Sequence, residues 1–195
     1  MAYPNNIGAY GFLPNTVEGG RVYNGATRNL PIASGYAKNI GYGDAVSLIA
    51  DGSITRVDAS TGAKTAWAIL PIGVFLGCSY TSPVLKYKVF SQYWPTGTVA
   101  ADAVAIVSDD PNVLFKATLT NAGTAYSSGA ATLADVGQNI GYFVTANTGS
   151  IVDGVNTATG NSAVSLDLAS KNTTATLPLR VVSMVQETAL SDGTF

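Results

Sequence analysis

The chain contains no histidine, has a single cysteine among its 195 residues, and carries charge on only 11% of them. Histidine, cysteine and clustered carboxylates supply most general acid–base catalysis, activated nucleophiles and transition-metal ligands. Their scarcity argues against an enzyme, and it predicts neither a cofactor nor a metal site. The single cysteine, Cys78, has no partner in the chain and follows apolar residues 74–76. We therefore expect a small buried side chain there rather than a reactive thiol.

Charge of either sign is also sparse, with ten lysines and arginines, twelve acids and a formal net charge of −2. The cations are scattered along the chain rather than gathered in a stripe, so nucleic acid is not an expected partner. No apolar run approaches the roughly 20 residues that span a bilayer, and no membrane partner is expected. A surface with so little charge leaves apolar patches that closed symmetry can bury, which predicts a homotrimer with the second half of the chain near the axis.

Short segments of strand-forming residues, separated by glycine, proline, asparagine and aspartate, fill the rest of the sequence. This pattern predicts an all-β fold, a short-stranded β-barrel or sandwich, with one helical turn at residues 132–137. The pair Asp51-Gly52 lies between two apolar segments, and this dipeptide favours a tight hairpin turn. The predicted strands are residues 45–49, 54–57, 66–70, 72–80, 87–94, 102–108, 113–119, 140–144, 163–168 and 179–185.

Composition divides the chain into three expected parts. Residues 1–34 contain three prolines and show no sustained period, which predicts an extended N-terminal arm. Residues 35–120 form a β-domain, and residues 121–195 a second β-rich subdomain that begins at a run of small and polar residues, 121–131. A long loop rich in threonine, asparagine and glycine is expected over residues 145–162.

The N-terminal arm carries aromatic and arginine side chains, the types that anchor protein interfaces. Two alternatives stay open: the arm packs on its own domain, or it reaches a neighbouring chain. If it reaches a partner, deleting residues 1–28 would leave a folded domain whose attachment is weakened. Including one surface candidate outside the arm, Tyr93-Trp94 before Pro95, the expected partner-binding residues are Tyr3, Tyr10, Phe12, Arg21, Tyr23, Arg28, Tyr93 and Trp94.

Three other sets of residues carry weaker functional hypotheses. Tyr87, together with Tyr93 and Trp94, could stack against the rings of a host glycan, although aromatic residues on strands more often lie in the core. The acids in residues 109–112 could bind a hard cation, but a turn is the simpler reading. A depolymerase acting through paired aspartates is the least favoured hypothesis, because no spacing brings two of them together.

Several segments together resemble capsid decoration, cement or head-fibre-like proteins of tailed bacteriophages. They are IASGY and YGDAV at residues 32–36 and 42–46, IGVFLGCSY and FSQYWP at residues 72–80 and 90–95, and TLPLRVV at residues 176–182. Their order and spacing cover most of residues 32–187. None of these segments is a catalytic signature, so the resemblance rests on the whole set.

The resemblance implies an all-β module on the outer surface of an icosahedral phage head, often trimeric, that clamps neighbouring subunits of the major capsid protein. Binding the assembled lattice but not free subunits would stabilise the shell by mass action. Several symmetric copies would make weak individual contacts sufficient. The expectation is a structural virion protein, and the alternative is a head fibre or surface module that binds host carbohydrate.

Overall fold

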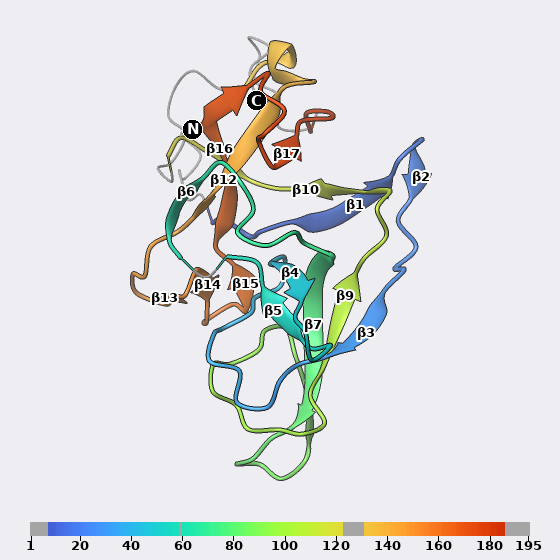
Figure 1. Cartoon of the computed structure of the whole chain (residues 1–195), viewed down its shortest axis with the longest axis vertical. Helices are drawn as coiled ribbons and strands as arrows, with labels where there is room; N and C mark the ends of the chain where they lie inside the picture. Colours follow the sequence, from blue (N-terminus) through green and yellow to red (C-terminus); the bar gives the residue numbers. More distant parts are fainter. Residues whose placement is uncertain (1–7, 59, 123–130, 186–195) are drawn as a thin grey trace, which may run out of the picture.

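The computed structural model describes residues 8–58, 60–122 and 131–185, and it confirms the all-β fold (Figure 1). Within these residues the chain forms four β-sheets and one turn of 3-10 helix, Leu133–Asp135. No helix among the described residues has the length and hydropathy to cross a membrane.

The largest sheet has six strands and carries the first hydrophobic core. The long strand β7 lies between β9 on one side and, on the other, β4 at its beginning and β8 at its end. Phe75 on β7 packs with Ile40, Ile54 and Trp94 in this core, and all four are fully buried. The strands are β3 (Arg28–Pro31), β4 (Ala45–Leu48), β5 (Ile54–Arg56), β7 (Gly73–Thr81), β8 (Lys88–Ser91) and β9 (Val104–Ser108).

A five-stranded sheet is built around β12 and β16, with only β11 parallel to its neighbour. A second core cluster joins this sheet to the first one, because Tyr142 and Val164 pack with Val74 and Phe12. The strands are β6 (Gly62–Lys64), β11 (Leu119–Thr120), β12 (Asn139–Val144), β16 (Val164–Asn172) and β17 (Leu179–Arg180).

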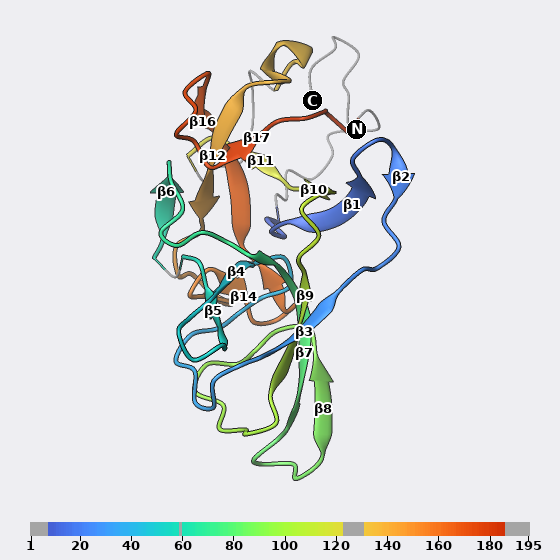
Figure 2. The ribbon, with the colours of Figure 1, turned by 45° about the vertical axis from the view of Figure 1, so that its right-hand side comes forward.

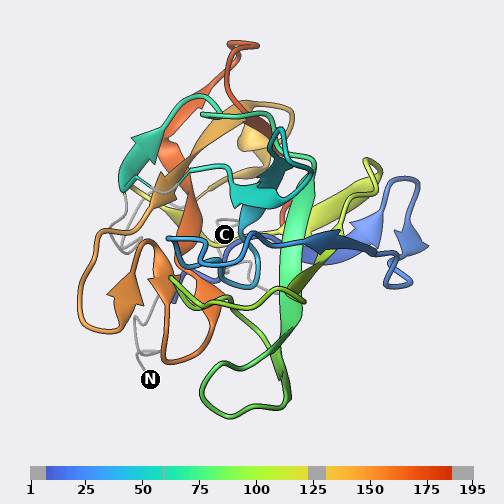
Figure 3. The same cartoon turned by 60° about the horizontal axis from the view of Figure 1, so that its bottom comes forward.

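Two three-stranded sheets complete the fold. β1 (Leu13–Val17) lies between β10 (Val113–Lys116) and β2 (Arg21–Val22), and Figure 2 shows this sheet extending to one side of the six-stranded sheet. β13 (Ile151–Val152), β14 (Val155–Asn156) and β15 (Asn161–Ser162) form the other, seen in orange in Figure 3. The long loop expected at residues 145–162 is therefore a small sheet, because its Asn/Thr/Gly-rich turns let three two-residue strands pair.

The described part of the predicted N-terminal arm, residues 8–34, packs on its own domain. It contributes β1, which pairs with β10 and β2, and β3, which pairs with β9, and it places Phe12 in the second core. Gly11 and Gly43 allow this approach: both have positive φ, and a Cβ on Gly11 would lie 2.5 Å from the Gly43 carbonyl oxygen. Of the two alternatives for the arm, these residues follow the first.

Two further observations bear on the expected organisation. Residues 66–70 form no strand, since Pro71 interrupts the apolar stretch and β7 begins only at Gly73. The boundary at residue 120 does not separate the sheets, because β6 from the first part pairs with β12 from the second. Side chains from both parts also share the second core.

Candidate functional site

The most unusual local chemistry in the described chain is a buried ion pair between Asp44 and Arg56. The Arg56 Nε lies 3.1 Å from the Asp44 Oδ2, and both side chains are almost fully buried. The Gly41 N–H also donates to Asp44 Oδ2, at 2.7 Å. Burial raises the pKa of the Asp44 carboxyl, and the nearby guanidinium and hydrogen-bond donors offset only part of that effect.

This ion pair ties the six-stranded sheet to the small sheet formed by β13 to β15. The Ser162 hydroxyl on β15 donates to Asp44 Oδ1 at 2.6 Å, and Arg56 Nη1 donates to the Asp153 carbonyl oxygen. At the rim of the same junction, Lys38 Nζ lies 3.3 Å from Asp153 Oδ1. We call Asp44, Arg56, Asp153 and Ser162 the seam, because they join segments about a hundred residues apart in the chain.

Local sequence places Arg56 inside the protein. On β5, Ile54 and Arg56 share one face, and Ile54 is fully buried. Gly154 leaves the space that the guanidinium fills, since a Cβ there would lie 2.8 Å from Arg56 Nη2. Sequence reasoning missed this site, although the alternation along residues 54–57 was a signal for an inward arginine.

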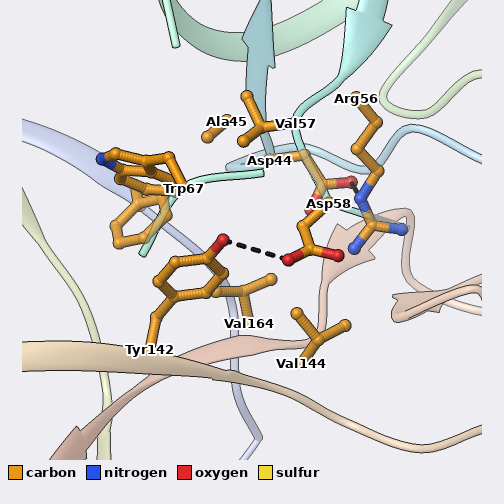
Figure 4. A pocket seen from close by; sticks show the side chains of 10 residues that line it. Asp44, Ala45, Arg56, Val57, Asp58, Trp67, Tyr142, Val144 and Val164 are labelled. Atoms are coloured by element: carbon orange, nitrogen blue, oxygen red, sulfur yellow. Dashed lines mark hydrogen bonds and ion pairs between the residues drawn. The ribbon is translucent and has the colours of Figure 1, made fainter. Parts of the chain in front are cut away.

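A small pocket adjoins the seam, and Figure 4 shows its polar and aromatic lining. The Tyr142 hydroxyl donates to Asp58 Oδ2 at 3.2 Å, and Lys64 Nζ lies 3.7 Å from the same oxygen. Trp67 stacks on Tyr142 with ring centroids 4.6 Å apart. With a cavity volume of about 10 Å³, the pocket has room for one water molecule and for no larger ligand.

The geometry of the seam and pocket favours a structural role rather than a catalytic one. Ser162 is fully buried behind Asp44, so its hydroxyl has no path to a substrate in this conformation. Burial raises the pKa of Tyr142, and the negative charge of Asp58 adds to this effect, so the hydroxyl stays a hydrogen-bond donor. Arg56 Nη2 is buried and has no hydrogen-bond partner among the described residues.

Two of the expected partner-binding side chains lie in the core, which corrects their assignment to a surface. Phe12 packs edge-on against Trp67, with centroids 6.3 Å apart. Trp94 is fully buried against Tyr80, at 5.2 Å, although Pro95 follows it. Backbone hydrogen bonds between Trp94 and Ile40 hold this segment inward. A glycan-stacking surface that includes the Trp94 ring is therefore absent from this conformation.

The other candidates are not brought together in one site. Arg21 is exposed on β2, while Tyr10, Tyr23 and Tyr93 are half-buried. The Tyr23 hydroxyl donates to the Ala26 carbonyl oxygen at 3.2 Å. Arg28 forms an exposed ion pair with Asp109 at 2.7 Å, within the same chain. Tyr3 lies outside the described residues.

Two smaller expectations are confirmed. Cys78 is a buried free thiol, and burial raises its pKa to about 12. The segment at residues 109–112 forms a turn, in which the Asn112 N–H donates to Asp110 Oδ1 at 2.9 Å.

The main surface feature that sequence reasoning missed, apart from Tyr87, is the end of the β7–β8 hairpin. We call residues 82–90, the loop and the first residues of β8, the finger, because Figures 1 and 2 show this hairpin projecting from the end of the molecule. It carries four exposed large apolar side chains, Val84, Leu85, Tyr87 and Phe90. Such a cluster on a surface is a signal of an interaction site.

The chain was also compared with known proteins. No family model matches it, and no match was found among curated proteins or solved structures.

Proposed function

We propose that this chain is a structural virion protein that binds the exterior of an icosahedral phage head and stabilises contacts between major capsid subunits. The observation that carries the proposal is the finger, an ordered loop of apolar side chains exposed on a surface with little charge. We name a capsid lattice as the partner because residues 32–46, 72–95 and 176–182 resemble phage decoration proteins. Self-association as a trimer is part of the same proposal.

The seam supports a mechanical role. A protein that holds neighbouring subunits together must keep its own segments together as well. The Asp44–Arg56 pair and the Ser162 hydrogen bond connect sheets that come from distant parts of the sequence. Polar groups buried this way are costly to separate, because each would lose its partner before it reaches water.

Reconstitution on phage heads tests the proposal. The purified chain would be mixed with expanded heads of the phage that encodes it, assembled without it, and the particles imaged by electron microscopy. We expect ordered density at symmetric positions outside the shell. We also expect the heads to come apart at a higher temperature, because the protein binds only the assembled lattice and so stabilises it. Heads already carrying the protein are the control and should take up no more. Absence of ordered density on the bare heads would overturn the proposal.

A further inference from the structure

The finger presents its apolar side chains on an ordered loop. The Ser82 carbonyl oxygen accepts from the Lys86 N–H at 2.9 Å, and the Ser82 hydroxyl accepts from the Leu85 N–H at 3.1 Å. At its base, the Thr81 N–H donates to the Asp102 carboxylate at 2.9 Å. Val84 is nevertheless 83% exposed and Phe90 79% exposed. A loop already held in one conformation loses little entropy on binding, so these side chains are suited to enter a partner surface.

Exposed apolar side chains also lie at the opposite end of β7. The Ile72 N–H donates to the Val46 carbonyl oxygen, so the segment before β7 runs beside the end of β4. Continued along the two segments, this register places Leu70 opposite Ile49, whereas Leu48 shares the other face of the sheet with Val46. We call Ile49 and Leu70 the patch; they are 40% and 79% exposed. β7 has nine residues, which puts roughly 25–30 Å between the patch and the finger.

The two ends carry opposite charge. Asp51 lies in the β4–β5 turn at this end of the molecule, and Asp109 and Asp110 follow β9, whose end lies beside the start of β7. The formal charges at the patch end add up to −2, from Arg28, Asp51, Asp109 and Asp110. The formal charges at the finger end add up to +1, from Lys86, Lys88 and Asp102. Oppositely charged rims around apolar centres are complementary, whereas finger against finger would bring lysines together.

We infer that the finger of one copy docks on the patch of a second copy, so that the chain associates head to tail. This inference rests on the self-association in the proposed function, but it does not depend on capsid binding. A contact between two different surfaces of the same chain is heterologous, and it closes into a ring or continues as a filament according to the rotation between neighbours. The patch would receive the Val84 and Phe90 side chains, and the acidic end would face the two lysines.

Paired surface variants test the inference through complementation. The finger variant is Val84→Ser with Phe90→Ser, and the patch variant is Leu70→Ser with Ile49→Ser. We expect the self-association affinity of each variant alone to fall by about tenfold or more, so that it sediments mainly as the 20.0 kDa monomer. An equimolar mixture should form a complex of two chains, because one intact finger meets one intact patch. Val22→Ser, at an 84% exposed position on β2, is the matched control and should associate like the unmodified chain.

The other outcomes discriminate between explanations. Suppose that the finger variant is monomeric, that the patch variant associates like the unmodified chain, and that the mixture forms no complex between the two variants. The contact is then finger to finger, and the inference is overturned. If both variants associate like the unmodified chain, another surface makes the contact. An unmodified chain that stays monomeric at all concentrations would remove self-association from the proposed function as well, leaving head binding to be judged by microscopy. If this monomer binds phosphatidylserine vesicles through Phe90, a membrane occupies the finger instead.

Discussion

The seam and the finger invert the usual distribution of side chains. At the seam, a carboxylate and a guanidinium are buried together between two sheets. At the finger, valine, leucine, tyrosine and phenylalanine side chains face solvent. The first arrangement holds the chain to itself, since separating its charges would leave them without partners. The second contributes nothing comparable to internal packing, and exposed apolar surface of this kind is stabilised by contact with another molecule.

The difference teaches that the two features serve different equilibria. Changes at the seam should alter the free energy of unfolding, whereas changes at the finger should alter association and leave the folded state intact. Substituting comparable side chains in the two regions, and measuring both unfolding and association, therefore tests whether the regions serve different equilibria.

The largest effect is expected at the seam. Arg56→Met leaves the Asp44 carboxyl buried without its counter-charge, and we expect a loss of about 3–5 kcal/mol in the free energy of unfolding, measured by urea denaturation. Lys38→Met removes the exposed ion pair with Asp153 and is the matched control, with an expected loss below about 1 kcal/mol.

A double variant, Asp44→Asn with Arg56→Met, tests whether the loss comes from the unpaired carboxylate. Removing both charges should cost less than the sum of the single changes, because no unpaired ion stays buried. A stability for Arg56→Met equal to that of the unmodified chain would show that the seam does not hold the sheets together.

Two phenylalanines compare the core with the finger. Phe12→Ala opens a cavity beside Trp67, and we expect it to lower the free energy of unfolding by about 3–5 kcal/mol. Phe90→Ala removes a ring already in solvent, and we expect a change within about 0.5 kcal/mol together with weaker self-association. Denaturation and sedimentation of the same samples measure both. Equal destabilisation by the two changes would break the comparison.

The smallest effect concerns the base of the finger. Hydrogen bonds from the Thr81 N–H and hydroxyl hold the pKa of the Asp102 carboxyl below its ordinary value of 3.8. Because the folded-state pKa is the lower one, this carboxylate stabilises the folded state above pH 3.8, and that stabilisation is lost as the pH falls through the lowered pKa. The Thr81 amide resonance in NMR spectra should report a titration midpoint below 3.8. Asp102→Asn should abolish the transition, and a midpoint above that value would contradict the prediction.

Alternation and turn chemistry predicted much of the fold because both are local. The hairpin around Asp51-Gly52 forms as expected, with Gly52 at positive φ. The 3-10 turn appears at residues 133–135, inside the expected segment. The sequence left both alternatives for the arm open because β1 pairs with β10 and β3 with β9, about 75 to 100 residues away, and no short-range pattern reports such pairing. Trp94 was misjudged because a proline marks a turn but does not say on which side the preceding ring lies.

The sequence by itself determined the all-β fold class and the shortage of groups suited to catalysis, because strand propensity, turn chemistry and the absence of histidine are properties of residues and their immediate neighbours. Only the tertiary structure decided which charges are buried and which apolar side chains are exposed. Asp44 and Ser162 are 118 positions apart, and their contact depends on the packing of two sheets. The patch likewise exists only because β4 and the segment before β7 run side by side. Burial is a property of the assembled surface, so local sequence cannot specify it.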